Sequence, residues 1–183
     1  MLIEANNKMN LVGKSTINQI WSRHILDCFQ VIDYIDENDK TMVDLGSGAG
    51  LPGLILAIAA NERKISLKIN LVEKSLKKTK FLKRVIDNLN LNVQIESKNI
   101  FGEENKIDSD VIVARAFKPL PVILQLIHNK AIKWKKIFVF LGKTGNKEVL
   151  QASKSWDIKY KQRMSITSTD SFIIEVNKLR KKN

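Results

Sequence analysis

The chain has 183 residues, 44% of them hydrophobic, which suits one domain with a substantial core. A single cysteine excludes an intrachain disulfide and a cysteine-rich zinc site, and with only two histidines we expect no metal. The formal net charge of +12 favours a polyanionic partner, nucleic acid above all, although a generally lysine-rich composition would also explain it.

The N-terminal region predicts helices and no secretory signal. The first ten residues, MLIEANNKMN, lack a continuous apolar stretch and suggest the end of an amphipathic helix. The longest apolar run, residues 54–60, is far shorter than the roughly 20 residues that span a bilayer, so we expect a cytoplasmic protein. A second helix is predicted over residues 17–34, capped by Ser15 or Thr16. Its expected apolar face consists of Ile20, Trp21, Ile25, Cys28, Phe29 and Ile32.

From residue 41 onward, strand and helix patterns alternate along the chain. The predicted strands are Thr41–Leu45, Leu67–Val72, Val93–Glu96, Val111–Ala114 and Ile137–Leu141. The predicted helices are Pro52–Asn61, Ser75–Leu89, Leu120–Asn129 and Lys147–Lys154, with Pro52 in the first turn of its helix. Repeated βα units indicate a parallel sheet that is covered on both faces. The last two strand-like runs, Ile158–Ile166 and Ser171–Val176, predict an antiparallel pair at one edge of the sheet.

The first predicted strand leads into a loop rich in glycine. Glycine lacks a Cβ atom and tolerates positive φ, so such a turn lets backbone N–H groups approach a ligand closely. Residues 48–53 (GAGLPG) fit the dinucleotide fingerprint G-x-G-x-x-G. Residues 44–50 (DLGSGAG) fit the looser acidic-Gly-Gly-Gly pattern of S-adenosylmethionine (SAM) enzymes. We expect the second pattern to contact a cofactor and Gly53 to permit close packing of helix on strand.

Glu73 follows the second predicted strand, where a carboxylate can accept hydrogen bonds from both ribose hydroxyls of an adenosyl group. Such an acid serves NAD and SAM equally. The terminal hairpin favours SAM, and Tyr34 and Tyr160 lie in no Tyr-x-x-x-Lys motif of the kind that an oxidoreductase would need. The alternatives are a small NAD(P)-dependent oxidoreductase and a catalytically silent RNA-binding module.

Five stretches of the chain together carry a family resemblance. They are Met9–Val12, Trp21–Asp27, Asp44–Gly53, Leu71–Glu73 and Val113–Ala116. With these motifs the chain resembles the RsmG/GidB family, the guanine-N7 methyltransferases of small-subunit (16S) ribosomal RNA. The resemblance implies a Rossmann-like class I SAM-dependent methyltransferase, an α/β fold with a mostly parallel seven-stranded sheet and a terminal antiparallel hairpin. We expect one domain over residues 1–183, with a helical cap (1–40) on a SAM-binding core (41–183).

The resemblance also implies a reaction and a set of cofactor contacts. The reaction is methylation of guanine N7 in 16S ribosomal RNA or the small ribosomal subunit, with SAM as the cofactor. The expected cofactor-binding residues are Gly46, Gly48, Leu51, Glu73, Asn99, Ile100 and Arg115. Guanine N7 carries an in-plane lone pair and no proton, so direct in-line transfer needs no general base, and no catalytic residue is assigned. We expect a monomer that acts without a metal or a membrane.

Arg115 has two interpretations. It could orient the cofactor or the target guanine, whose O6 and N7 attract a guanidinium group, or it could form a structural ion pair with Asp44 or Glu73. His24 and Asp27 are three residues apart on a predicted helix, and we expect them to form a buried pair.

Three clusters of basic residues are candidates for binding RNA phosphates. The clusters are Lys77, Lys80 and Arg84; Lys133, Lys135 and Lys136; and Lys178, Arg180, Lys181 and Lys182. The first lies on a predicted helix whose core-facing residues are expected to be Leu82, Val85, Ile86 and Leu89.

Overall fold

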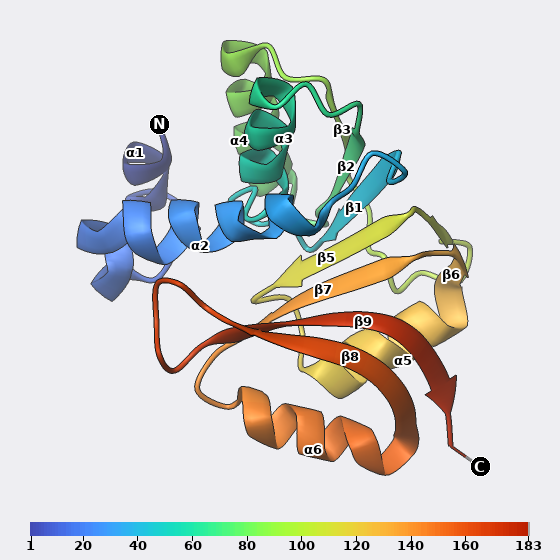
Figure 1. Cartoon of the computed structure of the whole chain (residues 1–183). Helices are drawn as coiled ribbons and strands as arrows, with labels where there is room; N and C mark the ends of the chain where they lie inside the picture. The colour runs from blue at the N-terminus through green and yellow to red at the C-terminus, as the bar shows by residue number, and fades with distance from the viewer. Residues whose placement is uncertain (183) are drawn as a thin grey trace.

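A seven-stranded sheet forms the centre of the computed structural model, which describes residues 1–182 (Figure 1). The strands are β1 (Thr41–Leu45), β2 (Lys68–Val72), β3 (Val93–Glu96), β5 (Val111–Arg115), β7 (Lys136–Leu141), β8 (Trp156–Met164) and β9 (Phe172–Lys181). Their order across the sheet is β3-β2-β1-β5-β7-β9-β8. The first five are parallel, whereas β9 runs antiparallel to both β7 and β8. The predicted α/β class, the mostly parallel sheet and the terminal hairpin are confirmed.

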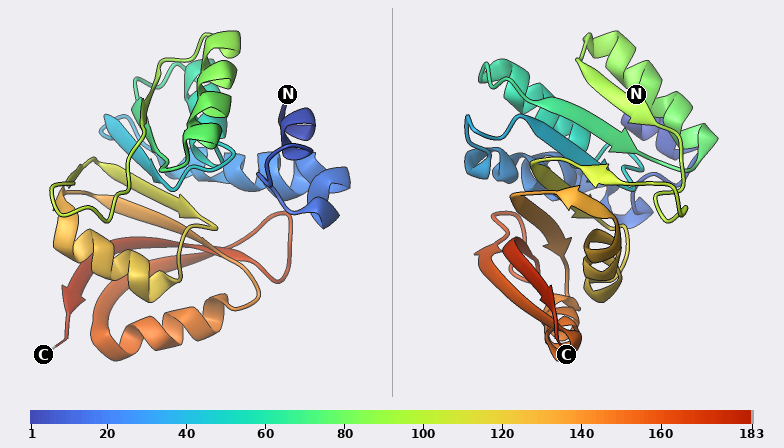
Figure 2. Two further views of the ribbon diagram at one scale, coloured as in Figure 1. Left: turned by 180° about the vertical axis from the view of Figure 1, so that it is seen from behind. Right: turned by 90° about the vertical axis from the view of Figure 1, so that its right-hand side faces the viewer.

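Four α-helices occupy the predicted positions between the strands. They are α3 (Gly53–Glu62), α4 (Leu76–Leu89), α5 (Leu120–Lys130) and α6 (Gly145–Ser155), and they lie on opposite faces of the sheet (Figure 2). Alternate residues of β1 enter two separate cores, as the period of a strand requires. Val43 and Leu45 pack with residues of α5 and α6, whereas Met42 packs with α3 and α4. Pro52 stands immediately before α3 and not in its first turn.

The N-terminal region contains α1 (Leu2–Asn6) and a continuous irregular helical rod that packs on α3. The rod comprises η1 (Lys14–Gln19), η2 (Trp21–Leu26), α2 (Asp27–Phe29) and η3 (Gln30–Tyr34). Its hydrogen bonding passes from 3-10 through a π-helical stretch and one α turn back to 3-10. Such π-helical stretches are uncommon and often occur at functional sites. The predicted helix is therefore present, although only part of it is α-helical.

Two details of the predicted N-terminal helix are wrong. The rod begins at Lys14, so the residue before its first turn is Gly13 and not Ser15 or Thr16. The Thr16 hydroxyl donates back to the Gly13 carbonyl over 2.7 Å. The Trp21 side chain is 77% exposed and does not belong to the apolar face. A local pattern of apolar residues does not distinguish 3-10, α and π spacing, and these place side chains on different faces.

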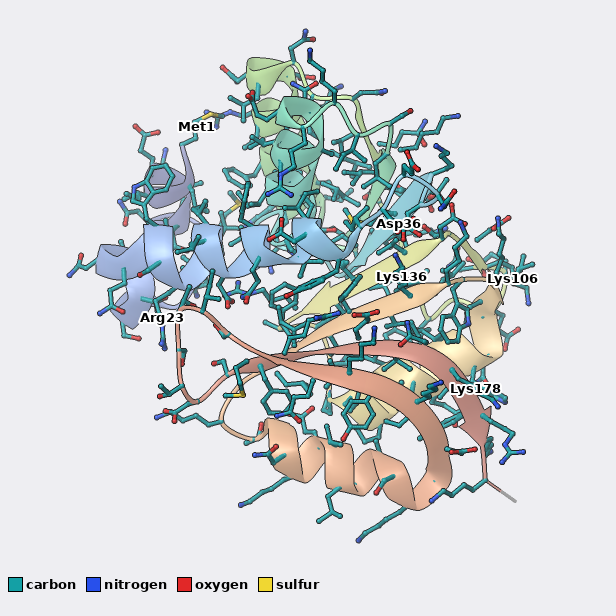
Figure 3. All side chains as sticks on the ribbon, in the orientation of Figure 1. Met1, Arg23, Asp36, Lys106, Lys136 and Lys178 are labelled. Atoms are coloured by element: carbon teal, nitrogen blue, oxygen red, sulfur yellow. The ribbon has the colours of Figure 1, made fainter. Side chains whose placement is uncertain are left out.

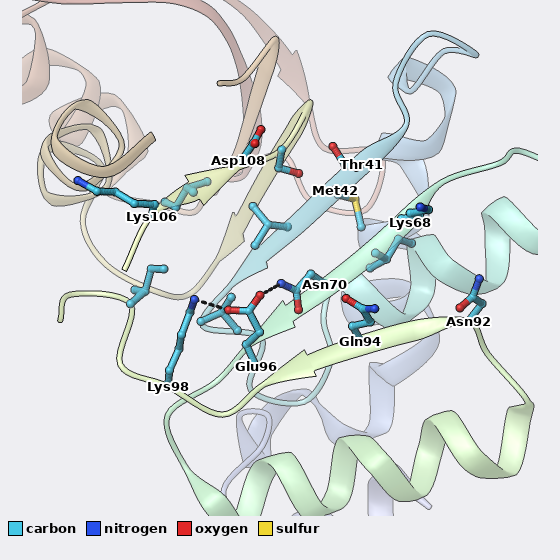
Figure 4. A pocket seen from close by; sticks show the side chains of 16 residues that line it. Thr41, Met42, Lys68, Asn70, Asn92, Gln94, Glu96, Lys98, Lys106 and Asp108 are labelled. Carbon is cyan, nitrogen blue, oxygen red and sulfur yellow. Dashed lines mark hydrogen bonds and ion pairs between the residues drawn. The ribbon is translucent and has the colours of Figure 1, made fainter. Parts of the chain in front are cut away.

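One face of the sheet is open at β2 and β3, contrary to the prediction of helices on both faces. Both strands alternate apolar and polar residues, and Asn70, Gln94 and Glu96 project from the open face. In the described chain, β3 and β5 are joined without an α-helix, through a segment that contains β4 (Ile107–Asp108), which pairs with β6 (Ala131–Lys133). A hollow of about 420 Å³ lies there, and in it Glu96 bonds both Asn70 and Lys98 (Figure 4).

Candidate functional site

The glycine loop turns sharply at the carboxyl end of β1. Gly46, Gly48 and Gly50 have φ values of 70°, 56° and 82°, a region in which residues with a Cβ atom are strained. The N–H of Gly46 donates to the carbonyl of Val72 over 2.9 Å, so the loop is tied to the end of β2. The loop therefore brings the ends of β1 and β2 together.

Gly53 permits α3 to pack closely on the sheet, as expected. A Cβ atom at this position would lie 2.3 Å from Leu71 Cδ2 and 2.7 Å from Asp44 Oδ2. The Gly53 N–H instead donates to Asp44 Oδ2 over 3.0 Å. The other carboxylate oxygen of Asp44, Oδ1, is buried without a hydrogen-bond partner among residues 1–182. Burial raises the pKa of Asp44 to about 7.

Glu73 is held in a single orientation at the end of β2. The residue is 6% exposed, and its Oε2 accepts the N–H of Gly48 over 2.9 Å. Its Oε1 accepts the N–H of Ser75, just before α4, over 2.8 Å. Each carboxylate oxygen has a further lone pair available for a ligand hydroxyl.

A cavity of about 470 Å³ opens beside the Glu73 carboxylate. It brings together four of the predicted site residues, namely Gly46, Glu73, Asn99 and Ile100. Ile100 is 4% exposed and belongs to the core. Asn99 is exposed, its Oδ1 accepts the N–H of Phe101 over 3.3 Å, and its carbonyl accepts Asn105 Nδ2 over 2.8 Å. The backbone after β3 is therefore fixed where it borders the cavity.

Eight residues that line this cavity were not among the predicted site residues: Val72, Lys74, Lys78, Lys98, Phe101, Ala116, Phe117 and Lys118. The Phe117 ring lies against Gly46, where a Cβ atom would come within 2.2 Å of it. The rings of Phe117 and Phe101 stack with their centroids 5.9 Å apart. Phe117 directly follows the Ala-Arg-Ala motif, and this position in the chain could have identified it as a site residue.

Three predicted site residues lie outside the lining of this cavity. Gly48 is connected to it through its hydrogen bond to Glu73. Leu51 is 6% exposed and packs with Cys28 and Ala49 beneath the N-terminal region. Arg115 lines a neighbouring cavity instead.

Arg115 is held by the N-terminal rod. Its Nη2 donates to the carbonyl of Arg23 over 2.9 Å and lies 3.1 Å from Nδ1 of His24. Its Nε lies 3.4 Å from Oδ2 of Asp27. The ion-pair partner of Arg115 is therefore Asp27, and the alternative of a pair with Asp44 or Glu73 is wrong.

His24 and Asp27 are both buried, as predicted, but they are connected through Arg115. Because a guanidinium group can only donate, Nδ1 of His24 must accept, and the ring proton is on Nε2. Nε2 then donates to the Thr16 hydroxyl over 2.7 Å. Burial, and after it the charge of Arg115, lowers the pKa of His24 to about 4, so the ring is neutral at neutral pH.

The predicted basic clusters differ in their surroundings. Lys77, Lys80 and Arg84 are exposed on α4, although Leu89 of the same helix is 50% exposed and not in the core as predicted. Lys133 and Lys135 lie 3.3 and 3.1 Å from Asp110 Oδ1, and Lys136 contacts Asp36 and Asp39. The third cluster lies in the last residues of β9 and just after it. Because β9 is antiparallel, this cluster also lies toward the amino ends of the parallel strands, and Figure 3 shows Lys178 far from Arg23.

The family of this chain follows from its similarity to known proteins. The family model of rRNA small subunit methyltransferase G matches residues 1–174. The chain belongs to the rRNA small subunit methyltransferase G family. The protein of that name from Pelagibacter ubique (strain HTCC1062) is 42% identical over 185 residues, which cover 100% of this chain and 86% of the relative.

Solved structures share the fold of this family member at low sequence identity. A SAM-dependent methyltransferase from Aquifex aeolicus has a TM-score of 0.63 at 13% identity, covering 90% of this chain and 98% of the other. TrmK of M. capricolum, solved with S-adenosyl-homocysteine, has a TM-score of 0.59 at 17% identity, covering 82% and 67%. The predicted family, the class I methyltransferase fold and the SAM cofactor are confirmed.

Two further observations concern the described part of the family member. No helix within residues 1–182 is long and apolar enough to cross a membrane. In the same residues, no group of three or more histidine, cysteine, aspartate or glutamate side chains is placed to hold a metal ion.

Proposed function

We propose that this protein transfers a methyl group from SAM to N7 of a guanine in the 16S ribosomal RNA of the small ribosomal subunit. Family membership supports the substrate class and the cofactor. The observation that carries the proposal is the fixed Glu73 carboxylate, which borders a cavity at the end of the glycine loop. We assign no catalytic residue in the sense of an acid, base or nucleophile.

The residues of the first cavity fit SAM. Glu73 would accept hydrogen bonds from the ribose hydroxyls, and Asn99 and Ile100 would flank the adenine. Gly46, Gly48 and Leu51 would form the loop beneath the remaining part of the cofactor, with Arg115 at its border; these seven residues are the proposed cofactor-binding set. When bound, SAM supplies a methyl group on a positively charged sulfur.

The buried Asp44 carboxyl supports the fit to a cation. Its Oδ1 has no hydrogen-bond partner within residues 1–182, and its pKa is raised to about 7. The charge of Arg115 lowers the pKa of Asp44 and the charge of Glu73 raises it, and these two residues border the two cavities. A positive charge nearby would favour the ionised form of this carboxyl.

The chain contributes positioning more than proton transfer. Guanine N7 is already a nucleophile, so the protein must hold the base in line, exclude water and bind the adjacent RNA. Four lysines surround the first cavity and suit RNA phosphates: Lys74, Lys78, Lys98 and Lys118. We propose further that the protein acts in the cytoplasm as a monomer, and that residues 1–40 form a cap on a single domain completed by residues 41–183.

Methyl transfer from labelled SAM to small ribosomal subunits that lack the modification tests the proposal. Borohydride reduction and aniline cleavage would then locate any N7-methylguanine, and we expect one cleavage in 16S ribosomal RNA. Label in the RNA without cleavage would exclude N7 as the target. RNA binding without any transfer would instead support a silent RNA-binding module, and tight NADH binding without SAM binding would support an oxidoreductase.

A further inference from the structure

A second cavity, of about 350 Å³, lies beside the cofactor cavity at the carboxyl edge of the sheet. The ends of β5 and β7 contribute to its wall, together with Leu11–Gly13 and His24 of the N-terminal region. Ala116, which has a φ of 51°, lines both cavities. The two cavities therefore meet at the residue that follows β5.

Methyl transfer requires the accepting atom to lie next to the methyl group, at about 3 to 3.5 Å. The residues proposed for ribose and adenine, Glu73 and Asn99–Ile100, lie at the ends of β2 and β3. The other end of the cofactor cavity, at Gly46 and Ala116, is left for the methyl-bearing part. The second cavity adjoins that end, whereas the hollow on the open face of β2 and β3 meets the cofactor cavity at Val72, Lys98 and Ile100.

Arg115 presents a fixed hydrogen-bond donor in this second cavity. Its Nη2 and Nε are engaged by the Arg23 carbonyl, by His24 and by Asp27. The remaining nitrogen, Nη1, has no partner among residues 1–182, and it is not one of the buried unpaired atoms. Because Nη2 and Nε hold the planar group in place, Nη1 has a defined direction.

The lining of the second cavity also suits a purine base. The Arg115 guanidinium lies 6.0 Å from the centre of the Phe140 ring, so a cation and an aromatic surface are adjacent. Leu11, Val12 and Phe172 add apolar surface. Such a combination is what a flipped base needs when an enzyme reads it outside the helix.

We propose that the second cavity receives the target base and that Arg115 Nη1 donates to guanine O6. This inference rests on the proposed function. Adenine carries an amino group, itself a donor, where guanine carries O6, so Arg115 would select guanine. The N7 lone pair stays free to form the bond to the methyl carbon while the carbon–sulfur electron pair goes to sulfur. The positive charge passes from sulfur to the purine, and no proton moves.

The test replaces the two partners of this hydrogen bond, first one at a time and then both together. The target guanosine, once mapped, is replaced by 2-aminopurine riboside through ligation of RNA fragments; this base lacks O6 but keeps N7. Both RNAs, assembled into small subunits, are offered to the wild-type protein and to Arg115→Met. We expect each single change to lower kcat/KM about 10- to 100-fold, and the second change to add less than about 3-fold to the first.

Binding measurements separate this role from folding and from cofactor binding. Because Arg115 lies only at the border of the cofactor cavity, SAM affinity by calorimetry should fall no more than about 3-fold in Arg115→Met, whereas subunit binding in the presence of S-adenosyl-homocysteine should weaken about 10-fold or more. Arg115→Lys, which keeps a charge for Asp27, serves as the second variant if Met does not fold. Arg180→Met, an exposed residue at the far edge, is the matched control and should change nothing.

Three outcomes would overturn the inference. Additive effects of the base and the Arg115 changes would show that O6 and Arg115 do not meet. Loss of SAM binding in folded Arg115→Met and Arg115→Lys, with no effect of 2-aminopurine, would assign Arg115 to the cofactor alone. No transfer by the wild-type protein to native subunits would refute the proposed function itself, and this inference with it.

Discussion

The two ends of the parallel strands, here called the amino edge and the carboxyl edge of the sheet, carry similar charged residues and use them differently. At the amino edge, lysines and aspartates neutralise one another: Lys133 and Lys135 flank Asp110, and Lys136 contacts Asp36 and Asp39. At the carboxyl edge, Glu73 is held by backbone N–H groups, and no lysine or arginine lies within ion-pair distance of it in residues 1–182. The amino edge pairs its carboxylates with lysines of the protein, and the carboxyl edge leaves lone pairs of Glu73 available for a ligand.

The largest effect that distinguishes the edges is expected from Glu73→Gln. The amide would place an NH2 group against one of the two backbone N–H groups that now donate to the carboxylate, and it would remove an acceptor for the ribose. We expect SAM affinity, measured by calorimetry, to fall about 100-fold. Glu96→Gln, at the end of the neighbouring strand but outside the cofactor cavity, is the matched control and should leave the affinity unchanged. Equal reductions in both variants would contradict this assignment.

Asp110→Asn tests the amino edge. Asp110 Oδ2 accepts the N–H of Lys40 over 2.8 Å, and two lysines lie near Oδ1. We expect the free energy of unfolding in urea to fall by about 2 kcal/mol, because the substitution removes charge-assisted hydrogen bonds to a covered side chain. SAM affinity should not change. Asp108→Asn, an exposed neighbour, should leave both quantities unchanged.

The pH dependence of stability should have opposite signs at the two edges. Burial raises the pKa of Asp110, but the Lys40 N–H and the two lysines outweigh it and hold that pKa well below its usual range. The stability that Asp110 contributes is present above about pH 4 and is lost as the pH falls further. Asp44, with its pKa raised to about 7, contributes stability that is present below about pH 4 and is lost as the pH rises to about 7.

Urea unfolding from pH 3 to pH 8 would measure both contributions, each at most about 1.4 kcal/mol per pH unit. Asp110→Asn should remove part of the acid-side loss, and Asp44→Asn should flatten the curve between about pH 4 and pH 7. A curve for Asp44→Asn parallel to that of the wild type would show that this carboxyl is already ionised in the folded protein.

The smallest expected effect concerns RNA binding. Replacing Lys74 and Lys78 by glutamine should reduce the slope of log affinity against log salt by about 0.7 for each RNA phosphate that the protein no longer neutralises. The same change at Lys178 and Lys181, which are exposed near the opposite edge, should leave the slope unchanged. A slope that responds only to the second pair would move the RNA footprint to the amino edge.

The sequence predicts the fold well where the pattern is local. The strands, the four long helices and the hairpin follow from apolar periodicity and turn residues. The open face could also have been predicted, because β2 (KINLV) and β3 (VQIE) alternate apolar and polar residues, as a strand with one face in solvent does. The error came from applying the rule for parallel sheets to every strand. The 3-10 and π turns of the N-terminal rod could not be predicted, since the periodicity of apolar residues does not resolve them.

The site residues that could be predicted from the sequence are those whose motifs lie at the ends of strands. Gly46, Glu73 and Asn99–Ile100 follow β1, β2 and β3, and adjacent parallel strands bring their carboxyl ends together. The partners of Arg115 could not be predicted, because they depend on how the N-terminal rod packs against β5. The same holds for the lysines of residues 133–136, whose aspartate partners are distant in the sequence.

The position of β9 has a consequence for how the molecule is assembled during synthesis. β9 is the last strand of the described chain, yet it lies between β7 and β8 in the interior of the sheet. Until it leaves the ribosome, β7 exposes an unpaired edge next to the helices that it must pack with. Closure of the sheet therefore waits until residues 172–181 have been synthesised, and until then the unpaired edge of β7 leaves the nascent chain exposed to aggregation.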